Sequence, residues 1–202
     1  MCYLTYLAVV SFDGLDAQHC YIAPSQHYSS TVTLDEDVAD EMKRWRTALV
    51  AMFKAADMDC VFFETAKNVK DQMHMSVECV PLPVEEGDMA PIFFKKAMTE
   101  VGSEWNTQKK FIDLAKEGSV RKVLPKGFSY FAVDFGLQPG FCHVIDDEST
   151  FPSNFAHEII GGMLDVDDSH WRKMVPQPLN ELNKKVLAFK KKFDDFDWTK
   201  KE

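Results

Sequence analysis

Long apolar runs are absent from this sequence of 202 residues. No hydrophobic stretch approaches the ~20 residues that a membrane-spanning helix needs. The first ten residues have neither a basic leader nor a small-residue cleavage site, so they do not predict a signal peptide. We therefore expect no membrane among the partners of the chain.

Paired cysteines are also lacking. The cysteines are odd in number and are never spaced as Cys-x-x-Cys: Cys2, Cys20, Cys60, Cys79 and Cys142. A disulfide scaffold or a redox motif needs such pairs. The pattern predicts reduced thiols in a cytosolic or nuclear protein.

An excess of positive charge and the common nucleic-acid-binding motifs are missing as well. Lys and Arg number 23 against 32 Asp and Glu, which gives a net charge of −9 and disfavours broad adhesion to nucleic acid. The sequence contains no RNP1 motif, KH loop or zinc finger, and no repeat with a period of roughly 20–50 residues. Only local basic patches are compatible with RNA contact.

The sequence does contain the patterns of a folded α+β protein. Hydrophobic residues make up 46% and charged residues 27%, as in ordinary globular chains. Strands are predicted over residues 3–10, 19–23, 59–65 and 74–80. A helix is predicted after Thr33-Leu-Asp-Glu36, which has the spacing of a capping box, because apolar residues recur at helical spacing as far as Ala56.

A change of pattern at Pro81-Leu-Pro83 predicts a domain boundary, giving units of residues 1–84 and 85–202. Pro91 suits the first turn of a helix that follows. The second unit is predicted to contain a polar helix or loop (105–126), two strands (128–135 and 141–145) joined by a hairpin at Gly136-Leu-Gln-Pro-Gly140, a short helix after Pro152 and an amphipathic helix from Leu179.

The segment His74-Met-Ser-Val-Glu-Cys-Val-Pro81 is the best candidate for chemistry. Side chains alternate across a strand, so His74, Ser76 and Glu78 are expected on one face, successive ones about 7 Å apart. This face is either a solvated strand surface or an active or ligand-binding face. Nothing around Ser76 resembles a nucleophile elbow, and residues two apart on a strand seldom form a catalytic triad.

Several longer motifs resemble known families. Gln18-His-Cys-Tyr-Ile-Ala-Pro-Ser-Gln-His27 is similar to the G-H-x-L-I-x-P-x-x-H stretch of the histidine-triad (HIT) superfamily. The chain resembles the C-terminal region of CwfJ-type splicing factors more closely, from about residue 17 onward. The motifs that carry this likeness include Glu78-Cys-Val-Pro-Leu-Pro83, Gly87-Asp-Met-Ala-Pro91, Val133-Asp-Phe-Gly136 and Glu158-Ile-Ile-Gly-Gly-Met-Leu-Asp165.

The resemblance implies a fold of two parts: a partial HIT-like domain (1–84), with an antiparallel sheet and a long helix, and a smaller α+β domain (85–202). It also places His74, Ser76 and Glu78 at the three triad positions. An unassisted serine is a poor nucleophile, and a carboxylate repels phosphate, which argues against HIT catalysis. An alternative register places Gln72, His74 and Ser76 there and would make His74 the nucleophile.

Some HIT relatives bind zinc with a Cys pair and two histidines, and the resemblance places His27 and His74 at the histidine positions. This chain has no such Cys pair, so no cofactor is expected; zinc is expected only if a Cys pair comes from outside the chain. His143, His157 and His170 are scattered without a recognisable ligand spacing.

Basic residues are the remaining candidates for a site. They form a local excess of positive charge between Trp105 and Lys126 and one face of the C-terminal helix: Lys109, Lys110, Arg121, Lys122, Lys126, Lys184 and Lys185. Such runs are either solvated helix faces or contacts to RNA phosphates.

The resemblance therefore implies a nuclear, non-catalytic interaction module that acts in late or intron-lariat complexes of the spliceosome. Its expected partners are spliceosomal proteins, intron-lariat RNA or snRNA, and the lariat debranching enzyme. The alternative is an active nucleotide-conjugate hydrolase that uses His74.

Overall fold

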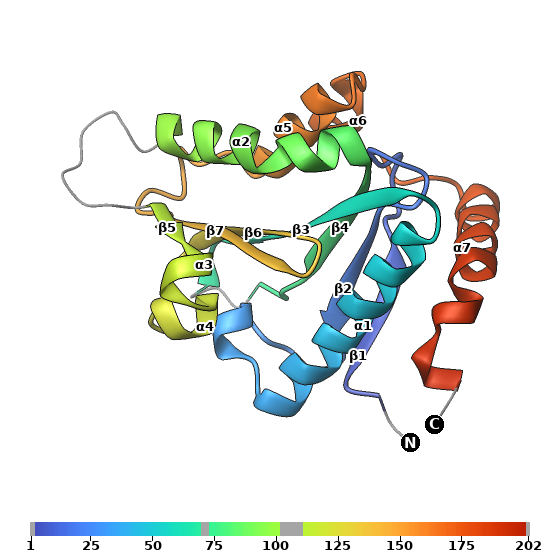
Figure 1. Cartoon of the computed structure of the whole chain (residues 1–202), viewed down its shortest axis with the longest axis horizontal. Coiled ribbons are helices and arrows are strands. Elements are labelled where there is room, and N and C mark those ends of the chain that lie inside the picture. The colour runs from blue at the N-terminus through green and yellow to red at the C-terminus, as the bar shows by residue number, and fades with distance from the viewer. Residues whose placement is uncertain (1–2, 70–72, 102–110, 201–202) are drawn as a thin grey trace.

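One seven-stranded antiparallel sheet runs through both halves of the chain (Figure 1). The computed structural model describes residues 3–69, 73–101 and 111–200. The strand order is β1-β2-β4-β3-β6-β7-β5. The strands are β1 (Thr5–Val9), β2 (Cys20–Pro24), β3 (Met58–Ala66), β4 (Val77–Pro83), β5 (Phe111–Asp113), β6 (Tyr130–Phe135) and β7 (Gln138–Val144).

Helices cover both faces of this sheet, which confirms the predicted α+β class. The long helices are α1 (Glu36–Lys54), α2 (Val84–Val101), α5 (Phe155–Met163) and α7 (Leu179–Phe193). The short ones are α3 (Leu114–Glu117), α4 (Val120–Val123), α6 (Ser169–Arg172) and the 3-10 turns η1 (Thr31–Thr33), η3 (Asp194–Phe196) and η4 (Trp198–Lys200). None of the helices in the described ranges is long and apolar enough to cross a bilayer.

Strand β3 shows why the helices lie in two layers. Its side chains alternate, so Cys60 and Phe62 join the core beneath α1, whereas Val61 and Phe63 join the core beneath α2 and α5. All four are buried. A strand that is covered on both faces has a sequence of consecutive apolar residues, and Cys60-Val-Phe-Phe63 is such a sequence.

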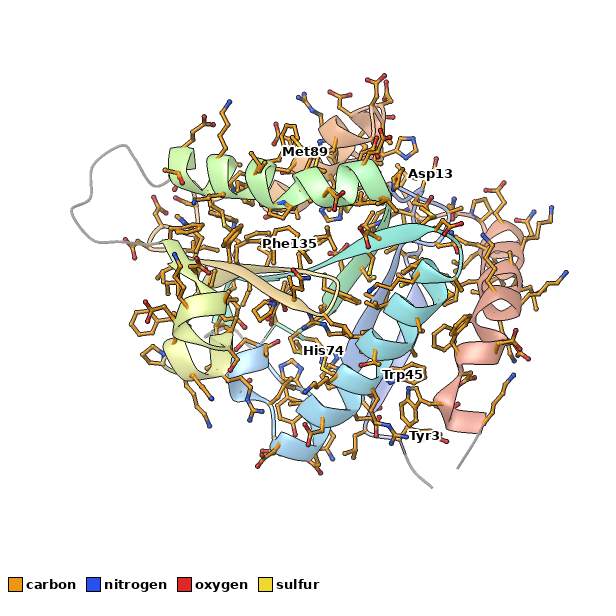
Figure 2. The ribbon with its side chains drawn as sticks, viewed as in Figure 1. Tyr3, Asp13, Trp45, His74, Met89 and Phe135 are labelled. Carbon is orange, nitrogen blue, oxygen red and sulfur yellow. The ribbon has the colours of Figure 1, made fainter. Side chains whose placement is uncertain are left out.

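The C-terminal helix α7 packs beside α1 and β1 and completes the core on that side. Figure 2 shows Trp45 on α1. Its ring centroid is 5.9 Å from that of Phe193 and 4.9 Å from that of Trp198, and its indole nitrogen donates to Thr5 Oγ1 at 2.9 Å. The amphipathic C-terminal helix predicted from the sequence is confirmed.

The two predicted units share the sheet. β3 pairs with β6 from Val61–Phe135 to Ala66–Tyr130. Across the same junction, Arg46 of α1 forms an ion pair with Asp134 of β6 at 2.7 Å. The predicted division of the chain after residue 84 stays a prediction. Strands β3 and β6, which come from its two sides, are hydrogen-bonded neighbours in one sheet.

Three local predictions are wrong in detail. The strand predicted from His74 begins only at Val77. Pro91 lies inside α2, which begins seven residues earlier at Val84, rather than in its first turn. The capping pair forms between Ser30 and Thr33 around η1, and the N-cap of α1 is Asp35.

The predicted hairpin is confirmed, with a tighter turn than expected. Gly136 adopts φ 59°, a left-handed conformation that favours glycine, and Phe135 pairs directly with Gln138. Gly140 belongs to β7, where an added Cβ would lie 2.3 Å from the carbonyl oxygen of Val133. This close backbone approach requires glycine at the bulge between the two strands.

The cysteines of the described chain are free and buried, in agreement with the prediction of reduced thiols: Cys20, Cys60, Cys79 and Cys142. Burial raises the pKa of Cys79 well above its ordinary value and raises that of Cys142 to about 12. The thiols of Cys79 and Cys142 therefore stay protonated and act as small apolar core residues.

A continuous sheet predicts cooperative unfolding of both units. Phe53→Ala in the core beneath α1 and Phe94→Ala in the core beneath α2 each empty a fully buried position. Each should lower the free energy of unfolding by about 3–5 kcal/mol and shift one common transition. Denaturant titrations followed by circular dichroism and tryptophan fluorescence test this; two separable transitions, each sensitive to one variant, would show that the units fold independently.

Candidate functional site

His74, Ser76 and Glu78 line one pocket, although only Glu78 lies on a strand. His74 and Ser76 precede β4 in an irregular segment, which is held by the hydrogen bond from the Met75 amide to the carbonyl of Tyr28 at 2.8 Å. Met75 is buried, and it lines the pocket together with its neighbours His74 and Ser76. The cavity has a volume of about 580 Å³.

Acidic side chains outnumber lysine and arginine in the described lining of this pocket. Its described lining includes three glutamates, Glu64, Glu78 and Glu148, against one lysine or arginine, Lys67. The Lys67 ammonium group donates to the carbonyl of Phe151 at 2.7 Å, so part of its donor capacity is already used. The pocket is large enough for a nucleotide, but its wall has the charge that repels phosphate.

Glu64 is the most deeply buried of these acids. Its side chain accepts hydrogen bonds from the Tyr130 hydroxyl at 2.7 Å and from the Thr31 amide at 2.9 Å. Burial nevertheless raises the pKa of Glu64 above its ordinary value. This carboxyl group lines the pocket and links β3 to β6 and to η1.

His74, the residue that a HIT-type mechanism would need, already has partners at both ring nitrogens. Nε2 lies 3.0 Å from the carbonyl oxygen of Pro24, which only accepts hydrogen bonds, so Nε2 carries the proton. Nδ1 lies 3.3 Å from Nδ1 of His27. Both imidazoles are exposed. Gln72, the first residue of the alternative register, lies outside the described residues.

The His27–His74 pair does not form a zinc site by itself. A structural zinc needs four ligands, and no third histidine, cysteine or acidic group joins this pair within the described ranges. The residues present thus do not fit the zinc site of the HIT relatives.

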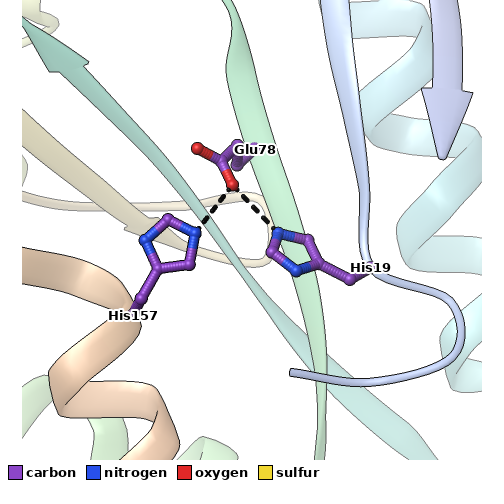
Figure 3. A group of neighbouring side chains, drawn as sticks. All are labelled: His19, Glu78 and His157. Carbon is purple, nitrogen blue, oxygen red and sulfur yellow. Dashed lines mark hydrogen bonds and ion pairs between the residues drawn. The ribbon is translucent and has the colours of Figure 1, made fainter. Parts of the chain in front are cut away.

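A second cluster, which the sequence did not predict, lies behind the pocket. His19 directly precedes β2, Glu78 lies on β4 and His157 lies on α5. The Nε2 atoms of both histidines are 3.0 Å from the same carboxylate oxygen, Oε2 of Glu78 (Figure 3). The side chains of His19 and His157 are 0% and 5% exposed, while that of Glu78 is 27% exposed because it also lines the pocket.

The proton positions in this cluster follow from the charge of Glu78. Burial by itself would raise the pKa of Glu78, but hydrogen bonds from His157 and His19 outweigh it and lower the pKa to about 2. An ionised carboxylate only accepts hydrogen bonds, so both Nε2 atoms donate. Burial lowers the pKa of His19, which favours its neutral form. The cluster is a carboxylate between two N–H donors.

His19 and His157 are the functional residues that sequence reasoning missed. His19 had a signal, since it stands in the HIT-like stretch before β2. His157 had none, because it is 79 residues from Glu78 in the sequence and reaches it only through the packing of α5 on the sheet. The other two scattered histidines do not bond to Glu78 in the described structure: His143 is buried in β7, and His170 bonds to the carbonyl oxygen of Gly14.

The predicted basic residues lie in two separate places. Arg121 and Lys122 belong to α4 and Lys126 follows it, whereas Lys184 and Lys185 belong to α7 near the other end of the molecule (Figure 1). Lys109 and Lys110 lie outside the described residues.

Two of these basic residues have structural contacts. Arg121 donates to the carbonyl of Leu34 at 2.9 Å. Lys185 donates to the carbonyls of Val10 and Phe12 at 3.0 and 2.9 Å, which ties α7 to the segment after β1. Lys122, Lys126 and Lys184 are exposed.

Comparison with known proteins gives matches over almost the whole chain. A family model described as "Protein similar to CwfJ C-terminal" matches residues 1–95, and one described as "Protein similar to CwfJ C-terminus 2" matches residues 104–199. The CWF19-like protein 2 homolog of Caenorhabditis elegans is 50% identical over 98% of this chain, and CWF19-like protein 2 of Homo sapiens is 46% identical over 96%.

A more distant relative is the pre-mRNA-splicing factor cwf19 of Schizosaccharomyces pombe, which is 28% identical over 96% of this chain. The chain spans only part of each relative: 42% of the C. elegans protein, 22% of the human protein and 32% of the S. pombe protein.

The cluster around Glu78 should contribute strongly to stability. In metal-free buffer at pH 7, Glu78→Gln should lower the free energy of unfolding by about 2 kcal/mol, because two hydrogen bonds to a charged acceptor are weakened. The contribution is present above the ordinary pKa of the carboxyl group, 4.5, and is lost as the pH falls toward 2. The difference between wild type and variant should therefore shrink over that range.

Urea titrations at several pH values measure this difference. Glu100→Gln, which removes an exposed ion pair with Lys96 on α2, is the matched control and should change stability by less than about 0.5 kcal/mol. Equal effects of the two substitutions would contradict the role assigned to Glu78.

Proposed function

The chain belongs to the CwfJ C-terminal family, and from this premise we propose that it is a non-catalytic interaction module of a pre-mRNA-splicing factor. The names of the relatives support the link to splicing. We place the module in the nucleus, in late or intron-lariat complexes of the spliceosome. Its partners would be spliceosomal proteins, intron-lariat RNA or snRNA, and the lariat debranching enzyme.

The acidic pocket is the observation that best supports a binding role over catalysis. In the register that the resemblance favours, Ser76 and Glu78 would stand at two of the three positions that are histidines in active HIT enzymes, and Glu78 lines the cavity together with Glu64 and Glu148. A phosphoryl group bound there would meet the negative charge of Glu78 and Glu148, with Lys67 as the one lysine or arginine of the described lining. The exposed wall of His74 and Ser76 is then a docking surface.

Crosslinking in a nuclear extract tests the proposal most directly. The purified chain, carrying a photo-crosslinker at Met73 on the exposed rim of the pocket, should capture spliceosomal proteins or intron RNA. A crosslinker at Leu187 on the exposed face of α7 is the matched control for position. Recovery of only unrelated abundant proteins at both positions would contradict the proposal.

An active nucleotide-conjugate hydrolase is the second candidate, and the presence of His74 in a cavity of nucleotide size favours it. We predict no release of nucleotide from adenosine phosphoramidate or dinucleoside polyphosphates, because both ring nitrogens of His74 have hydrogen-bond partners and a serine at the middle position is a poor nucleophile without a base. Liquid chromatography of the products measures this. Turnover that disappears in His74→Ala would establish the enzyme instead.

The exposed lysines predict weak RNA binding that depends steeply on salt. Replacing Lys122 and Lys126 by Glu should weaken binding of an intron-derived RNA and lower the log–log salt slope by about one for each RNA phosphate that a lysine no longer neutralises. The matched variant on α7 is Lys184→Glu, which tests the second basic region separately. Filter binding at several salt concentrations measures the RNA affinity of both variants. Binding that is independent of salt, or absent at low salt, would show that these lysines do not contact RNA phosphates.

A further inference from the structure

The buried cluster of His19, Glu78 and His157 has the ligand set and spacing of a metal site. One ligand atom from each residue lies within 4.8 Å of the other two, and this is the one such group of three found in the described chain. Each Nε2 is 3.0 Å from Oε2 of Glu78. Ligand atoms about 2.1 Å from a tetrahedral zinc ion lie roughly 3.4 Å apart. Outward movements of a few tenths of an ångström would therefore admit an ion.

We propose that His19, Glu78 and His157 bind a divalent transition-metal ion of the Zn²⁺ class. Two imidazoles and one carboxylate suit zinc and its transition-metal neighbours, whereas magnesium and calcium prefer sites made of oxygen. Three protein ligands leave one coordination position for water or another ligand, as in catalytic rather than structural zinc sites. This site needs no cysteine pair and is separate from the His27–His74 pair.

The two histidines can change from hydrogen-bond donors to metal ligands by moving one ring proton each. Without metal, both Nε2 atoms donate to Glu78; binding an ion requires their lone pairs, so each proton must move to Nδ1. The Nδ1 atoms of His19 and His157 are buried and have no hydrogen-bond partner among the described residues. Among the described residues, no hydrogen bond at Nδ1 therefore holds either ring in its Nε2–H tautomer.

The same unpartnered nitrogens limit the affinity of the site. Metal-binding histidines usually donate their second N–H to an acceptor, and loss of that acceptor weakens binding by about 10–100-fold. We therefore expect an exchangeable ion that a chelator removes, in contrast to the tightly held zinc of a zinc finger.

The ion would join both halves of the chain. His19 and Glu78 come from the first half, and His157 comes from α5 in the second. Because a ligand bound only by the folded state stabilises it, saturating zinc at about a hundredfold excess over Kd should raise Tm by roughly 5–10 °C.

The first experiment titrates the whole, chelator-treated chain with Zn²⁺ while imidazole nitrogens are observed by long-range ¹⁵N–¹H NMR. We expect binding of one ion, with the signals of His19 and His157 changing from the Nε2–H to the Nδ1–H form. Unchanged spectra of these two rings at saturating zinc would overturn the proposal, and this readout does not depend on any variant folding correctly or on the splicing partners.

The second experiment compares variants by calorimetry. Glu78→Gln and His157→Gln each keep hydrogen-bonding groups in place of the ligand, and each should weaken Zn²⁺ binding at least about tenfold. His27→Ala is the control, because its imidazole belongs to the other histidine pair, and it should leave the affinity unchanged. Loss of binding in His27→Ala, with both cluster variants unaffected, would move the metal to the His27–His74 pair and refute this assignment.

Discussion

Strand β3 hydrogen-bonds to β4 on one side and, through the pairs from Val61–Phe135 to Ala66–Tyr130, to β6 on the other. This second ladder fixes the position of everything in the C-terminal half relative to the N-terminal half. It places the segment from Glu148 to Ser153 opposite the segment from His74 to Glu78, so the pocket has walls from both. It also brings α5 over the sheet, where His157 meets Glu78.

Local patterns in the sequence were sufficient to predict most elements of this fold. Short apolar runs bounded by turn signals marked β1, β2, β6 and β7, and helical spacing of apolar residues marked α1 and α7, because burial of one helix face produces that period. Predictions failed where another part of the chain decides the outcome. β5 is a strand of only three residues that pairs with β7, and Pro91 is accommodated within α2.

The candidate site was predictable only in part, and the reason is sequence distance. Strand alternation predicted one shared face for His74, Ser76 and Glu78; only Glu78 lies on a strand, and the three line one pocket together with Met75. The partners of Glu78 are 59 and 79 residues away and come from a loop and a helix with no period in common. Periodicity says nothing about such contacts; they follow from strand order and helix docking, which a single sequence does not specify.

The buried thiols on adjoining strands have a practical consequence. Cys20, Cys60 and Cys79 lie on β2, β3 and β4, and their burial protects them from alkylating reagents while the sheet is intact. Cys142 lies on β7, in the other half. Reagent can reach each sulfur only when its own strand separates from the sheet. Mass spectrometry of alkylated peptides would therefore time the opening of each region of the native molecule without any engineered cysteine.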